Sequence, residues 1–193
     1  VVDGAGAAAA IIPYEYDTWY FCEMIVDIDN DWCEFYVDGT LEHEYQWTLG
    51  TFGTAGANTL GGSNIYANPG AMGTPPGAYF DDICFEELGN PPPEPICEDF
   101  DALEVGGYVA DQLGGNWTTW SLTPGTDEDA IVSDMYSLSP SNSIVVEGIT
   151  DLVHLITGSN IVSGKWSYSL NIYVPTGTTG YFNLQKDIVP GTE

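Results

Sequence analysis

Runs in which apolar and polar residues alternate recur at intervals of about ten residues, with Gly, Pro, Asn and Asp between them. This period-two pattern is typical of half-buried β-strands joined by turns. Helical periodicity is nearly absent, and the one alanine run, Ala7 to Ala10, is too short to form a stable helix alone. The pattern predicts an all-β, antiparallel sandwich or jelly roll.

A proline-rich connector divides the predicted strands into two groups. The first segment, 1–88, contains expected strands at 19–28, 32–38, 41–47, 59–60, 64–67 and 78–87, with turns at 29–31 and Asp38-Gly39. Residues 89–96 form the connector, expected to be extended because proline cannot donate to a sheet. The second segment, 97–193, contains expected strands at 96–100, 108–109, 117–121, 130–133, 143–146, 152–156, 165–174 and 179–185. Residues 4–10 and 190–193 are expected to be loops.

Two stretches carry a family resemblance. One contains YDTWYFCEMIVDIDNDWCEFYVDGTLEHEYQW and ends with AYFDDICFEEL; the other begins CEDFDALEVGGYVADQLGGNWTTWS and ends with GKWSYSLNIYVPTGTTGYFNLQK. The first resembles the C-terminal half, and the second the N-terminal half, of a concanavalin A-like lectin/glucanase (LamG-like) jelly roll. Such domains occur in secreted surface proteins of bacteria that use type IX secretion. The resemblance implies a fold and an extracellular setting, and leaves the activity open.

The order of the two halves departs from that family, because the C-terminal half comes first. Either the chain is a circularly permuted jelly roll, or it is one period of an array cut within a domain. In the second case, unpaired strands would need a complementary half from another copy. Head-to-tail pairing of that kind does not close, and it grows a filament.

Net charge narrows the range of partners. The chain has 193 residues with two Lys, no Arg and 29 Asp and Glu, so its net charge is −27. A nucleic-acid partner is excluded, since phosphate binding needs clustered Lys and Arg, and anionic membrane surfaces are disfavoured for the same reason. No apolar run is long enough to span a bilayer, and a signal peptide is absent or already removed. The expected partners are cations, neutral polysaccharide or other copies of the chain.

The four cysteines suit an oxidising, extracellular or cell-surface location. Cys84 and Cys97 are the best disulfide candidates, because they flank the connector. With a turn at Asn30-Asp31, Cys33 would face Ile28, which leaves Cys22 too far away for a bridge. Each cysteine can also be a small buried apolar residue.

Acidic side chains on both sides of the connector form the first candidate site. Asp81 and Asp82 precede it, and Asp99 and Asp101 follow it, so these carboxylates should converge. Ca²⁺ binds carboxylate and carbonyl oxygens, and the resemblance implies a structural calcium at such positions. The alternative is a solvated acidic rim. The run from Asp27 to Asp31 resembles the start of an EF-hand loop, but Trp32 stands where that loop needs glycine, so a hairpin turn is the better interpretation.

Aromatic residues form the second candidate site. Trp117 and Trp120 fit the alternation least and are the expected exposed platform for a sugar, although large aromatics usually lie in cores. Asn116 opens the sequon Asn116-Trp117-Thr118 and is a candidate glycosylation site.

Motifs of hydrolases are missing: the carboxylate alternation of glucanases does not occur, and neither histidine has a suitable partner spacing. The sequence therefore predicts a non-enzymatic structural subunit or tandem repeat of an extracellular filament or adhesin, paired through β-strands. The alternative is a carbohydrate-binding, lectin-like module.

Overall fold

A computed structural model of the chain describes residues 2–4, 7–50, 56–69, 73–89, 95–156 and 160–191. Within them the strands are β1 (Val2–Gly4), β2 (Ala7–Ala10), β3 (Trp19–Asp27), β4 (Trp32–Val37), β5 (Thr40–Gln46), β6 (Gly62–Tyr66), β7 (Gly77–Glu87), β8 (Ile96–Glu98), β9 (Trp117–Thr119), β10 (Ile131–Ser133), β11 (Ser143–Glu147), β12 (Asp151–Leu155), β13 (Lys165–Tyr173) and β14 (Phe182–Gln185). The helical elements of the same residues are η1 (Trp47–Leu49) and α1 (Val109–Leu113). Among the described helices, none is long and apolar enough to cross a membrane.

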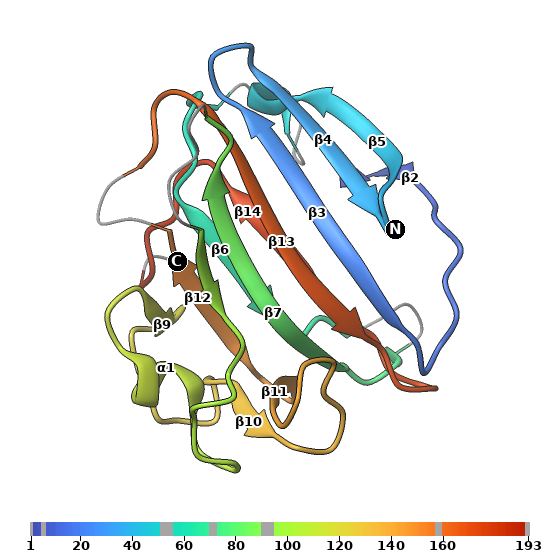
Figure 1. Cartoon of the computed structure of the whole chain (residues 1–193), viewed down its shortest axis with the longest axis vertical. Helices are drawn as coiled ribbons and strands as arrows, with labels where there is room; N and C mark the ends of the chain where they lie inside the picture. Colours follow the sequence, from blue (N-terminus) through green and yellow to red (C-terminus); the bar gives the residue numbers. More distant parts are fainter. Residues whose placement is uncertain are drawn as a thin grey trace.

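Two antiparallel sheets pack face to face (Figure 1). The larger sheet has the order β10-β11-β7-β13-β3-β4-β5, with β8 added to β7. The smaller sheet has the order β14-β6-β12-β9. The predicted all-β sandwich of jelly-roll-like kind is thus confirmed. The hairpin of β1 and β2 forms a separate two-stranded sheet, where the sequence led us to expect a loop.

Each sheet contains strands from both sequence segments. β13 lies between β3 and β7, and β6 lies between β12 and β14 (Figure 1). The two segments therefore pair with each other inside one chain. Residues 90–94 of the predicted connector lie outside the described residues, as do Thr192 and Glu193.

The core lies between the two sheets and follows the alternation of the strands. Its largest fully buried side chains come from both layers, because every second residue of each central strand points inward. They include Phe80, Phe85, Tyr168, Leu170, Ile65 and Leu152. One core polar pair is satisfied internally: the hydroxyls of Ser63 and Tyr168 lie 2.6 Å apart.

Two details differ from the sequence expectations. The hairpin of β3 and β4 closes at the Asp27–Trp32 pair, so its connection is longer than the expected Asn30-Asp31 turn and Cys33 faces Val26. Asp27 accepts hydrogen bonds from the backbone and side chain of Asn30, which stabilises that connection. The expected strand at 108–109 is instead an isolated bridge at Tyr108 followed by the start of α1.

Candidate functional site

The smaller sheet ends before the larger one does, and this leaves an apolar groove. β14 is the last strand of the smaller sheet, whereas the larger sheet continues from β13 through β3 and β4 to β5. The inner faces of β3, β4 and β5 therefore lie beside an uncovered space, a cavity of about 580 Å³. This volume is in the usual range for sites that hold a small ligand or a short segment of chain.

Aromatic and aliphatic side chains make most of the groove wall. They come from the inner face of the larger sheet and from the strand and loop of β14. The wall includes Met24, Phe35, Val37, Tyr45, Tyr181 and Phe182. These residues are only half-buried, although they occupy positions that point toward the core. Phe35 and Phe182 face each other across it with their ring centroids 6.5 Å apart.

The groove carries no formal charge. None of its lining residues is Asp, Glu, Lys or Arg, although the chain has a net charge of −27. Its polar groups are neutral amides and hydroxyls, among them Asn68 and Asn183. The side-chain oxygen of Asn183 has no hydrogen-bond partner, while its amide nitrogen donates to the Tyr181 hydroxyl at 3.3 Å. The site is thus suited to a neutral occupant.

Cys22 contributes the one thiol of the groove wall. Burial raises its pKa to about 12, so the thiol is a weak nucleophile near neutral pH. Cys33 is also free and is fully buried on β4, and its pKa is likewise raised to about 12 by burial. The prediction that these two cysteines do not form a bridge agrees with the structure.

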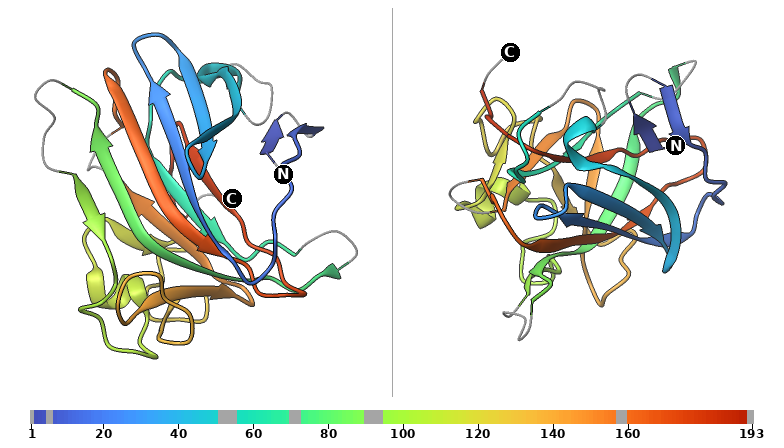
Figure 2. Two further views of the ribbon diagram at one scale, coloured as in Figure 1. Left: turned by 45° about the vertical axis from the view of Figure 1, so that its right-hand side comes forward. Right: turned by 90° about the horizontal axis from the view of Figure 1, so that it is seen from above.

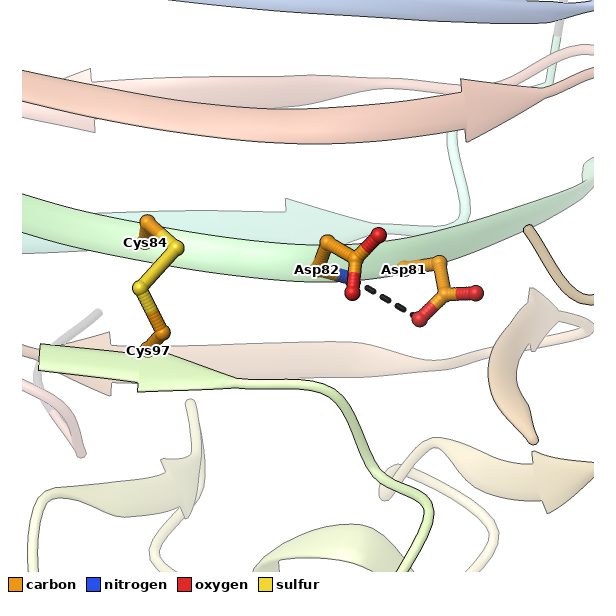
Figure 3. The surroundings of a disulfide bond; sticks show 4 residues. All are labelled: Asp81, Asp82, Cys84 and Cys97. Carbon is orange, nitrogen blue, oxygen red and sulfur yellow. Dashed lines mark hydrogen bonds between the residues drawn. A yellow bond between two sulfur atoms is a disulfide. The ribbon is translucent and has the colours of Figure 1, made fainter. Parts of the chain in front are cut away.

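The predicted disulfide between Cys84 and Cys97 is present. The two residues are cross-strand partners on β7 and β8, the strands before and after the connector (Figure 3). The disulfide links the three-residue strand β8 covalently to β7, a strand inside the larger sheet.

The acidic residues before the connector have different roles. Asp81 is fully buried, and its carboxylate accepts hydrogen bonds from the backbone N–H groups of Leu138 and Ser139 at 2.7 and 3.1 Å. It also accepts one from the backbone of Asp82 (Figure 3). Asp81 therefore fixes the loop over the outer face of β7, which leaves it little capacity to ligate a metal.

Asp82 interrupts the regular pairing of β7 with β13. It has a φ of 48°, and the register of the two strands shifts opposite it, as expected of a β-bulge. Burial raises the pKa of its carboxyl, and the charges of Asp99 and Asp101 raise it further. The charges of Asp99 and Asp101 therefore act on the Asp82 carboxyl, while the expected convergence of all four acids into one site stays a prediction.

A ready-made metal site is not formed by these acids. The Asp99 carboxylate accepts a hydrogen bond from the backbone N–H of Asp101, and the Asp101 carboxylate accepts one from the backbone N–H of Asn142 at 2.9 Å. Each carboxylate therefore already has one hydrogen-bond donor from the protein. Within the described part of the chain, no group of three or more His, Cys, Asp or Glu side chains is arranged to hold a metal ion. Calcium binding at Asp82, Asp99 and Asp101 stays a prediction.

The tryptophan prediction is wrong for Trp117. Its side chain is only 8% exposed and stacks on the imidazole of His154, with ring centroids 4.1 Å apart and planes within 3°. Phe100 packs against its other side. A sugar therefore cannot stack on Trp117, whereas Trp120 is half-buried and Asn116 is exposed.

His154 is itself an unusual core residue. It lies on β12 beside Trp117 and is 5% exposed, and its Nδ1 has no hydrogen-bond partner. Burial lowers the pKa of its imidazole to about 4, so the ring is neutral at physiological pH.

The two lysines have local partners. The Lys165 ammonium lies 4.0 Å from the Glu34 carboxylate on the outer face of the larger sheet. The Lys186 ammonium donates to the Thr48 carbonyl at 2.6 Å, and burial lowers its pKa. Neither is placed among the groove-lining residues.

Two comparisons with known proteins give no match for this chain. It matches no model of a protein family, and a search of curated proteins finds no similar sequence. The site is therefore defined by its own geometry. Sequence alternation indicated which groove residues point inward, but nothing in the pattern showed that the opposite sheet stops short of them.

Proposed function

We propose that this chain is a non-enzymatic structural module of an extracellular assembly, and that copies associate by adding a β-strand at the open groove. One observation carries the proposal: β14 ends the smaller sheet and leaves an apolar, uncharged groove beside the inner faces of β3 to β5. An added strand would pair with the edge of β14 that has no partner strand among the described residues, and would cover half-buried side chains such as Phe35 and Val37.

Charge favours the groove over any other contact surface. Two copies that each carry a net charge of −27 repel each other, and the chain has only two lysines with which to form salt bridges. An uncharged groove avoids both the repulsion and the cost of burying carboxylates. Since donor and acceptor surfaces would differ, the contact is heterologous and extends into a linear assembly.

Two further features support the setting and the absence of catalysis. The Cys84–Cys97 disulfide is of the kind that persists in oxidising compartments. The groove offers a thiol of raised pKa and neutral amides, a set without a general base near neutral pH. The proposed concanavalin A-like relationship is compatible with the sandwich and rests on the quoted motifs alone.

A pair of charge variants tests the assembly. Tyr181→Glu places a carboxylate in the groove, while Tyr16→Glu places the same charge on a residue that is 44% exposed and outside it. Light scattering and electron microscopy should show filaments or oligomers for the wild type and Tyr16→Glu, and monomers for Tyr181→Glu. A wild type that stays monodisperse and monomeric at high concentration would refute the proposal.

Binding of a neutral polysaccharide is the second candidate. The specific observation is the combination of aromatic faces with Asn68 and Asn183 in an uncharged groove, where the Asn183 oxygen lacks a partner. A glycan array should then show binding that Tyr181→Ala abolishes. Trp120→Ala, outside the groove lining, is the matched control. No binding to any neutral polysaccharide would eliminate this candidate.

We also propose a structural Ca²⁺ at Asp82, Asp99 and Asp101. Support comes from the raised pKa of Asp82, because its carboxylate is held near two others without a basic residue among its interaction partners. A divalent cation would relieve that repulsion.

A further inference from the structure

We infer that the strand entering the groove is residues 7–12 of a second copy of this chain. The inference rests on the proposed function, since it names the partner and the segment that the open groove accepts. We call residues 2–12 the arm. In one copy the arm is the donor, and in the next copy the edge of β14 beside the groove is the acceptor.

The arm has no place in either main sheet. Its strands β1 and β2 pair with each other and with no other strand among the described residues. Figure 2 shows this hairpin, in dark blue, outside the two sheets, and β2 contacts β5 at the edge of the larger one. A two-stranded hairpin is marginally stable in water by itself, so little free energy opposes its opening to pair elsewhere.

The composition of the arm matches that of the groove. From Gly4 to Tyr14 the sequence is GAGAAAAIIPY, without a charged residue, in a chain whose net charge is −27. Both faces of a strand over residues 7–12 are apolar, so either register on β14 would place apolar side chains against the groove wall. A strand with acidic residues would instead have to bury its carboxylates in the groove, at a cost in free energy.

Length also permits the pairing. At about 3.3 Å per residue, the six residues 7–12 extend over roughly 20 Å, whereas the four residues of β14 need about 13 Å. The side chain of Ile11 is 77% exposed in the isolated chain, which leaves it free to gain burial in a partner.

The arm's own groove is a poorer target than that of a neighbour. Ile12, Pro13 and Tyr14 already line the groove of their own chain, and β2 lies against β5, at the far edge of the larger sheet from β7. After the arm, the chain is held in place at Asp17, whose carboxylate accepts hydrogen bonds from the backbone N–H and the hydroxyl of Thr176. To reach its own β14, the arm would have to fold back over Pro13 and Tyr14, which line the groove.

Complementation between two defective variants tests the inference. Ala9→Pro removes a backbone N–H that the added strand would donate, so the arm should no longer pair with β14. Ala9→Ser keeps that N–H and is the matched control. Tyr181→Glu spoils the groove as acceptor. Each defective variant alone should be monomeric, Ala9→Ser should assemble like the wild type, and an equimolar mixture of Ala9→Pro and Tyr181→Glu should give a 1:1 heterodimer by native mass spectrometry.

Cys22 provides an internal probe of groove occupancy. Alkylation by N-ethylmaleimide at mildly alkaline pH, followed by peptide mapping, should slow about tenfold for Cys22 of the Ala9→Pro subunit when the heterodimer forms, because only that subunit has its groove filled. Modification of Cys33, which is fully buried and outside the groove lining, should not change.

The outcomes separate this inference from the proposed function. Assembly of Ala9→Pro alone, or a mixture that stays monomeric while the wild type assembles, overturns the arm as donor and leaves the assembly proposal standing. A monomeric wild type in which Cys22 is protected, and becomes reactive in Ala9→Pro, shows that the arm fills its own groove and overturns both.

Discussion

The two ends of the larger sheet have the same inward alternation and opposite exposure. At the covered end, β7 and β13 place Phe80, Ile83 and Leu170 against the smaller sheet, and these side chains are at most 1% exposed. At the open end, Met24, Phe35 and Val37 occupy equivalent inward positions on β3 and β4 and remain half-buried. The difference lies in the opposite layer, which ends at β14.

This comparison shows what a strand pattern specifies. Alternation determines which side of a sheet is apolar, because successive side chains point to opposite faces. It does not determine whether another layer covers that side. Whether an apolar inner face is left uncovered therefore depends on the strand order of both sheets. Such a face is a place where a further strand or a ligand can bind.

The largest expected contrast is between matched phenylalanines at the two ends. Phe80→Ala should lower the free energy of unfolding by about 3–5 kcal/mol, because it leaves a cavity in a packed core. Phe35→Ala should cost about 1–2 kcal/mol, since its side chain is only partly buried. Urea denaturation measures both, and equal losses would mean that the open end is covered in solution.

The disulfide should be the next largest contributor, and it belongs to the covered end. Cys84→Ala combined with Cys97→Ala should lower the free energy of unfolding by about 3 kcal/mol, because a loop of 13 residues is no longer closed in the unfolded chain. Dithiothreitol should destabilise the wild type by a similar amount and leave the double variant unchanged. A reductant effect on the double variant would point to another cause.

Acid should weaken the covered end through His154. Its folded pKa of about 4 lies below the ordinary value of 6.5, so the unfolded chain binds the proton first and stability falls as pH drops from about 6.5 toward 4. The loss should reach about 2 kcal/mol at pH 5.

The variant His154→Leu isolates this contribution. Half-buried carboxyls with raised pKa, such as those of Asp82 and Asp151, change stability in the opposite direction as pH falls. The difference between wild type and variant removes their effect. Between pH 7 and pH 5 the wild type should lose about 2 kcal/mol more stability than His154→Leu, as followed by thermal melts, and parallel pH profiles would contradict the assignment.

Calcium should give the smallest change. If Ca²⁺ joins Asp82, Asp99 and Asp101, adding it should raise the melting temperature by roughly 2–4 °C for each kcal/mol of binding, and EDTA should reverse the rise. Asp82→Asn should abolish the response, while Glu42→Gln, on β5 at the open end, should retain it. An identical melt with calcium and with EDTA would refute the site.

Much of the fold follows from the sequence because strand alternation is a local property. The long strands at 19–27 and 165–173 are within one residue of their predicted bounds. The disulfide was also predictable, since the connector separates Cys84 from Cys97 by only 13 residues.

The missed features depend on contacts between distant residues. Trp117 breaks the alternation because α1 packs on β9 and covers the side that would otherwise meet water, so all three residues of that strand are buried. The groove could not be predicted, since its existence depends on which strand ends the smaller sheet. The cysteine register differs from the expected one because the β3–β4 connection also includes Ile28 and Asp29, which precede the expected turn.

The scarcity of lysine has a consequence for how the folded chain meets proteases. Proteases of trypsin-like specificity cut after Lys or Arg, and this chain offers them only Lys165 and Lys186. Lys165 opens a strand that is hydrogen-bonded to β3, and the ammonium group of Lys186, which such a protease must bind, is held by the Thr48 carbonyl. The folded chain therefore resists this class of enzyme through composition and strand pairing together, without needing a protective coat.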